Sequence, residues 1–144
     1  MDRAALDAAI AAGLPHGGWC PAGRRAEDGP IPPRYPLRET EAADHETRTR
    51  LNVRDSDATL VLARPPLRGG TRLTVEVAEA LGRPALVVDP WAEEELGAIP
   101  AWLARHGVAV LNVAGPRESE EPGIHAASFA VLLRLCRALS RPAA

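Results

Sequence analysis

Three mostly apolar runs in the second half of the chain indicate buried strands, and each is followed by a segment with helical periodicity. The predicted strands cover residues 59–63, 85–88 and 108–113. The predicted helices cover residues 71–81, 91–105 and 124–139. Continuous apolar runs are typical of parallel strands that are covered on both faces. The β-α-β-α-β-α order predicts a Rossmann-like α/β fold, a three-layer sandwich with a mainly parallel sheet and right-handed crossovers.

The first half of the chain has a different pattern. Apolar residues recur at helical spacing over residues 2–12, and Gly13 supplies a stop. Glycine and proline are dense from 15 to 37, which predicts a loop with at most a short strand around Trp19. Charges of alternating sign predict a polar helix over residues 41–55. In the second half, Pro100 is expected to kink or split its helix.

The composition fits an ordinary globular protein. The 144 residues suffice for one domain, taken as residues 1–144, with a sizeable core. The apolar share is 46% and the net charge is -2, which gives no whole-chain reason to expect a nucleic-acid or membrane partner. All 17 basic residues are arginine, so a single arginine is weak support for a site.

Neither export nor metal binding is indicated. The N-terminus lacks the basic-then-apolar order of a secretory signal, and no apolar run approaches the roughly 20 residues that span a bilayer. Cys20 and Cys136 are far apart in sequence, and the four histidines have no metal-ligand spacing. The histidines are interpreted as surface or capping residues, and Cys20 as a structural cysteine. We predict a cytoplasmic protein without a metal site.

The loop after the first apolar run is the main candidate for a phosphate site. Gly69 and Gly70 let the backbone approach an anion, and the amides and dipole of the following helix favour negative charge. Thr71 can bond a phosphate oxygen, and Thr74 lies within the first turn or so. The alternative is an ordinary turn in which Thr71 is the helix N-cap.

The loop after the last apolar run is the second candidate. Two such loops at one sheet edge predict a cleft, because ligands of open parallel sheets bind beyond the carboxyl ends of the strands. Its candidate ligand-binding residues are Asn112, Gly115 and Arg117. Asn112 ends an apolar strand and needs a polar partner. The alternative is an acidic surface connection in which Arg117 pairs with Glu118 or Glu121.

The glycine-rich first half adds Arg24 as a candidate anion clamp. Its neighbours Arg25, Glu27 and Asp28 leave open a solvated charge cluster instead.

Several segments together resemble one known family. They are residues 2–7 (DRAALD), 17–21 (GGWCP), 23–32 (GRRAEDGPIP), 52–57 (NVRDSD), 69–71 (GGT) with Thr74 and Glu76, and 112–117 (NVAGPR). This pattern resembles the putative molybdenum carrier family, Rossmann-like proteins related to the lysine-decarboxylase-like and LOG proteins. The resemblance runs nearly end to end and implies a nucleotide-like or molybdenum-cofactor-like ligand.

One feature departs from that family. Its members usually begin with a strand and a Gly-Gly-Gln-Thr-Gly loop before the Asp-Arg-Ala segment, whereas Met1 stands here where the loop would end. We expect a chain truncated at its N-terminus relative to the family, through a late start site. A missing strand would leave a sheet edge open, and by analogy with related folds we expect association into a homo-oligomer.

Three functions follow as hypotheses. The preferred one is a binding or carrier protein for a small phosphorylated ligand, either the molybdenum cofactor or a nucleotide derivative. The second is a LOG-like phosphoribohydrolase that cleaves an N-glycosidic bond, with Glu76 as the catalytic residue and Arg24 or Arg117 as phosphate partner. The spacing from Gly69 to Glu76 is similar to the pattern of those enzymes but not the same. The third is a ligand-sensing interaction module.

Overall fold

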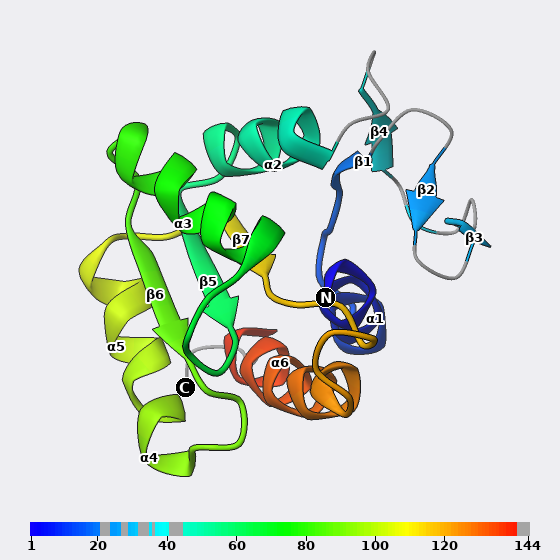
Figure 1. The fold of residues 1–144 in the computed structure, drawn as a ribbon. Helices are drawn as coiled ribbons and strands as arrows, with labels where there is room; N and C mark the ends of the chain where they lie inside the picture. Colours follow the sequence, from blue (N-terminus) through cyan, green and yellow to red (C-terminus); the bar gives the residue numbers. More distant parts are fainter. Residues whose placement is uncertain (21–23, 27–28, 32–34, 36, 41–44, 141–144) are drawn as a thin grey trace.

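The structure is a computed structural model that describes residues 1–20, 24–26, 29–31, 35, 37–40 and 45–140. Its elements are shown in Figure 1. In chain order they are α1 (Asp2–Ala12), β1 (Gly18–Cys20), β2 (Arg25–Ala26), β3 (Gly29–Pro30), β4 (Leu37–Glu39), α2 (His45–Arg54), β5 (Ala58–Leu62), α3 (Gly69–Ala80), β6 (Ala85–Val88), α4 (Glu93–Leu96), α5 (Ala98–Arg105), β7 (Leu111–Ala114) and α6 (Ile124–Ser140).

The main sheet has three parallel strands in the order β6-β5-β7. In the register of the central strand, Thr59 pairs with Ala85 on one side and with Asn112 on the other. All residues of β5 are buried because both of its faces are covered, whereas the outer strands β6 and β7 are mostly half-buried. The predicted α/β fold with a mainly parallel sheet is confirmed.

The last strand begins at Leu111, three residues later than the apolar run indicates. The carboxylate of Asp57 accepts hydrogen bonds from the backbone N–H groups of Val110 (2.8 Å) and Ala109 (2.9 Å). These two bonds lower the pKa of Asp57. Because a side chain holds these amides, the segment forms a bend before the strand starts.

Helices cover both faces of the main sheet. On one face, α1, α5 and α6 form a core with Leu60 and Leu62 of β5. On the other face, α2 lies beside α3 and they share a smaller cluster of Val53, Val77 and Ala78 (Figure 1). The helix after β5 therefore lies on the opposite face from the helices after β6 and β7. Such a reversal opens a crevice beyond the carboxyl ends of the strands.

The N-terminal part packs through α1. This helix lies along α6 (Figure 1) and ends at Gly13, whose φ of 72° is the left-handed conformation that glycine adopts readily. The buried Tyr35 anchors the following loop, because its hydroxyl donates a 2.6 Å hydrogen bond to Asp7. The short strand expected around Trp19 is β1, which pairs in parallel with β4. The segments 21–23, 27–28, 32 and 41–44, which carry parts of the predicted motifs and helix, lie outside the described residues.

The start of α3 differs from the sequence pattern, whereas the split near Pro100 agrees with it. α3 begins at Gly69, so both glycines of the candidate phosphate loop belong to its first turn. The segment around Pro100 is split, as expected, into α4 and α5 at Gly97. Proline has no N–H to bond the carbonyl four residues earlier, at Leu96, and the break falls there. Among the described residues, no helix combines the length and apolar character needed to cross a membrane.

Candidate functional site

The carboxyl ends of β5 and β7 meet at Gly115. A Cβ added to Gly115 would lie 2.5 Å from the carbonyl oxygen of Leu62 and 2.5 Å from Cε of Met1. A side chain does not fit at that distance, so this glycine lets two strand ends and the start of α1 converge. The geometry thus gives Gly115 a packing role at the edge of the sheet where the cleft was predicted.

The N-terminus of α3 lies beyond the end of β5. Gly69 and Gly70 are exposed, and a Cβ added to either would have no atom within 4 Å. Arg68 occupies the N-cap position and its side chain makes no capping hydrogen bond. The interpretation of Thr71 as the N-cap is therefore wrong, because Thr71 lies inside the first turn. An uncapped helix N-terminus with bare backbone is suited to an anion.

A small polar cavity of about 20 Å³ lies next to this helix. Its lining residues come from α2, α3 and β7: Arg48, Thr49, Asn52, Thr74, Asn112, Val113 and Ala114. The structure thus brings together two predicted residues, Thr74 and Asn112, that are far apart in sequence. A polar space of this size accommodates about one water-sized group.

Hydrogen bonds order part of the cavity wall. The Asn112 side-chain amide donates to the hydroxyl of Thr59 on the neighbouring strand at 3.2 Å, which supplies the polar partner that Asn112 was expected to need. The hydroxyl of Thr74 donates to the carbonyl of Gly70 at 2.8 Å and so ties the cavity to the first turn of α3. Thr49, which is 7% exposed, adds a second threonine to the lining.

The contribution of α2 to the cavity is not apparent from the sequence. Arg48 and Thr49 lie in a segment whose pattern predicts only a polar helix, and Asn52 lies in a motif of the family resemblance. One signal for Asn52 was present, because the segments that contain Gly18 and Asn52 both belong to the resemblance. A Cβ added to Gly18 would lie 3.1 Å from the side-chain oxygen of Asn52, so the glycine makes room for this asparagine.

Arg24 lies apart from the described lining of the polar cavity. Its guanidinium donates to three backbone carbonyls of its own loop, those of Tyr35 (2.7 Å), Ile31 (3.0 Å) and Leu37 (3.1 Å). These bonds hold the loop together, which removes the reason for reading Arg24 as an anion clamp.

Glu76 also points away from the cavity. Two residues along a helix correspond to a rotation of about 200°, so Glu76 and Thr74 face nearly opposite sides of α3. Glu76 is exposed and forms a 3.1 Å ion pair with Arg72 one turn earlier. The predicted catalytic carboxylate is thus a surface residue.

The loop after β7 is built around Glu118. Its carboxylate accepts hydrogen bonds from the backbone N–H groups of Gly123 (2.8 Å) and His125 (3.2 Å), which lower its pKa. The start of α6 thus already holds an anionic side chain. Arg117 is exposed and its nearest acidic partner is Glu120, at 4.0 Å, instead of the predicted Glu118 or Glu121.

Arg64 joins all three loops at the carboxyl edge of the sheet. Its guanidinium carbon lies 4.0 Å from the ring centre of Trp91. Nε lies 3.5 Å from Asp89, directly after β6, and Nη1 lies 3.8 Å from Glu121, after β7. This arginine does not stand out in the sequence, because its partners come from separate segments.

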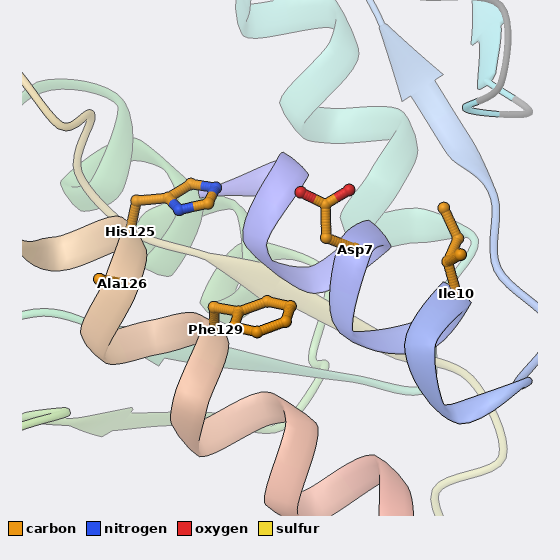
Figure 2. Close-up of a pocket in the computed structure, with 5 residues that line it drawn as sticks. All are labelled: Asp7, Ile10, His125, Ala126 and Phe129. Atoms are coloured by element: carbon orange, nitrogen blue, oxygen red, sulfur yellow. The ribbon is translucent and has the colours of Figure 1, made fainter.

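A larger, open groove of about 570 Å³ runs between α1 and α6 (Figure 2). Asp7 and Ile10 line it from α1, and His125, Ala126 and Phe129 line it from α6. It lies outside all the predicted site residues and combines an apolar floor with one carboxylate and one imidazole.

Comparison with known proteins places the chain in a defined group. Residues 1–136 match the family described as circularly permutated YpsA SLOG. The fold is similar to the crystal structure of a "Putative molybdenum carrier protein" from Syntrophus aciditrophicus SB, with a TM-score of 0.88 and 42% sequence identity. That match covers 94% of this chain and 87% of the other. No curated protein sequence matches the chain. The two matches confirm the resemblance found in the sequence.

Proposed function

The chain belongs to the circularly permutated YpsA SLOG family, and from this premise we propose that it binds and carries a small phosphate-bearing ligand, either the molybdenum cofactor or a nucleotide derivative. The solved relative is named a "Putative molybdenum carrier protein", which supports a carrier role for this chain. The phosphate would sit at the N-terminus of α3, beside the polar cavity.

One observation carries this proposal: the uncapped N-terminus of α3 adjoins a cavity lined by a cation and neutral donors. Gly69 and Gly70 leave the backbone open to a ligand. The helix dipole favours an anion at this end, and Arg48 adds a full positive charge to the cavity wall. Thr49 adds a hydroxyl group to the same wall.

The acid and base chemistry of the cavity favours binding over hydrolysis. Hydrolysis of an N-glycosidic bond needs a carboxyl group placed near the reacting bond. No carboxylate is present among the described residues that line the polar cavity. Thr74 faces the cavity one turn after Thr71, whereas Glu76 is paired with Arg72 on the surface. The lining of the polar cavity therefore supports a carrier, and the position of Glu76 gives no support to a catalytic role for that residue.

The direct test is titration calorimetry with ribose 5-phosphate and inorganic phosphate. Gly70→Asp should abolish binding of both, because it places a carboxylate against the phosphate. Ala80→Asp is the matched control, since it adds the same charge on the exposed last turn of the same helix. Thermal unfolding of each variant separates loss of binding from loss of the fold.

A second pair of variants tests the cavity itself. Thr49→Val removes the hydroxyl group at nearly constant side-chain shape, and Arg48→Gln removes the positive charge. Both should weaken ribose 5-phosphate binding, and only Arg48→Gln should also reduce its salt dependence. If the wild-type protein binds no phosphate compound, or if Gly70→Asp binds as well as wild type, the proposed site is wrong. Native mass spectrometry of gently purified protein would then identify any ligand that copurifies.

A further inference from the structure

The stacked pair of Arg64 and Trp91 lies at the same carboxyl edge as the proposed phosphate site. Arg64 follows β5 by two residues, and the same loop continues into the first turn of α3. Trp91 follows β6, and its ring lies against the start of α6, where a Cβ added to Gly123 would be 3.6 Å from the ring. The pair therefore bridges the segments that frame the end of the central strand.

Both members of the pair are partly open to solvent. The side chain of Arg64 is 49% exposed, and Trp91 is 39% exposed. An arginine that lies over an indole keeps its planar guanidinium oriented, and its outer face can stack on another flat ring. The carboxylates of Asp89 and Glu121 lie beside this guanidinium at 3.5 Å and 3.8 Å. This arrangement of Arg64 over the ring of Trp91 is termed the platform.

The charges around the platform select the kind of group that can lie on it. Two carboxylates face one guanidinium, so the local charge is net negative and a second phosphate would be repelled. Carboxylates instead accept hydrogen bonds from N–H and NH₂ groups. We infer that Arg64 and Trp91 form a stacking subsite, edged by Asp89 and Glu121, for a planar heterocycle with N–H donors, such as a purine or a pterin.

This inference rests on the proposed function, because it places the ring of the same ligand whose phosphate lies at α3. The ring and the phosphate can be tested separately with two probes. Guanosine 5′-monophosphate and ribose 5-phosphate share the sugar phosphate and differ in the ring. The wild-type protein should bind the first about tenfold more tightly, a factor in the range measured for one stacked base.

Variants of Arg64 and Trp91 should remove the preference for guanosine 5′-monophosphate and leave the affinity for the sugar phosphate nearly unchanged. Trp91→Ala and Arg64→Lys should bring the ratio of the two affinities close to one, while the affinity for ribose 5-phosphate changes by less than about twofold, since it lacks the stacked base. Trp91→Phe keeps a ring and should retain most of the preference. Arg72→Lys is the matched control for Arg64→Lys, because Arg72 is exposed and pairs with Glu76 on α3.

A third probe tests the carboxylate edge. Inosine 5′-monophosphate lacks the exocyclic amino group of guanosine 5′-monophosphate and should bind several-fold more weakly, and Glu121→Gln should narrow that difference. Equal binding of guanosine 5′-monophosphate and ribose 5-phosphate by the wild-type protein would overturn the stacking subsite and leave the phosphate site standing. A preference that survives at full size in both Arg64→Lys and Trp91→Ala would do the same. Absence of binding by every probe would refute the proposed function, and the subsite with it.

Discussion

Replacement of Gly115 by alanine should destabilise the protein, because the added methyl group has no room. Its Cβ would lie 2.5 Å from the Leu62 carbonyl oxygen and 2.5 Å from the Met1 Cε. The Met1 side chain can rotate away, but the carbonyl belongs to the end of the central strand. Either β5 or the chain after β7 must therefore shift.

The size of the effect follows from two opposing terms. Overpacking in a well-packed region costs about 1–3 kcal/mol. Alanine also restricts the unfolded chain, which stabilises by about 0.4–1 kcal/mol where the native backbone suits it. Gly70→Ala is the matched control, because an added Cβ there has no atom within 4 Å and the residue lies in a helix. The difference between the two variants isolates the close contact, at about 1–3 kcal/mol.

Thermal unfolding followed by circular dichroism measures this difference. For a chain of this length, about 4 °C of Tm corresponds to 1 kcal/mol, so the two variants should differ by roughly 4–12 °C. Urea unfolding gives the same comparison as a free energy. A Gly115→Ala protein as stable as Gly70→Ala would refute the close approach of the two strand ends.

Two further predictions concern titrating side chains. Glu118→Gln should lower the Tm at pH 7, because the backbone N–H groups of Gly123 and His125 lower the pKa of the folded carboxylate. This stabilisation is complete above the unfolded pKa of about 4.3 and is lost as the pH falls through the lowered pKa of the folded protein, so the Tm values of the two proteins should converge in acid. A constant difference in Tm across that pH range would contradict the role of the Glu118 carboxylate. Both cysteines should react slowly with iodoacetamide at pH 7 until the protein is unfolded, since Cys20 is buried and burial raises the pKa of the Cys136 thiol; rapid labelling of the native protein would show that one of these thiols is accessible.

The main features of the fold could be predicted from local patterns. The strands appear as apolar runs because a parallel strand covered on both faces has no polar side, as in β5. Gly13 ends α1 because glycine readily adopts the left-handed backbone conformation that follows the last turn of a helix. Pro100 splits its helix because it removes one backbone donor. The predicted start of β7 is wrong, because the backbone amides of Ala109 and Val110 donate hydrogen bonds to Asp57. That residue lies 52 positions before Ala109 and 53 before Val110.

Only some residues of the candidate site could be predicted from local sequence patterns. The sequence could indicate Gly69, Gly70 and Thr74, because all three lie in one short segment where a strand is followed by the start of a helix. Arg48 and Thr49 could not, because their side chains meet Thr74 and Asn112 only after α2 packs beside α3. Arg24 has the charge that a phosphate site needs and Glu76 the carboxylate that the predicted hydrolase needs, yet the hydrogen bonds of Arg24 and the ion pair of Glu76 engage them elsewhere.

The sequence by itself therefore determined the elements, their order and the sheet type, because these depend on periodicity and on backbone restrictions that act within a few residues. The tertiary structure alone decided which polar side chains share a cavity, which arginine lies at the strand ends, and which glycine is required by packing. Those outcomes depend on contacts between segments such as β5, β7 and α1, and no local pattern records the distance between the carbonyl of Leu62 and Gly115.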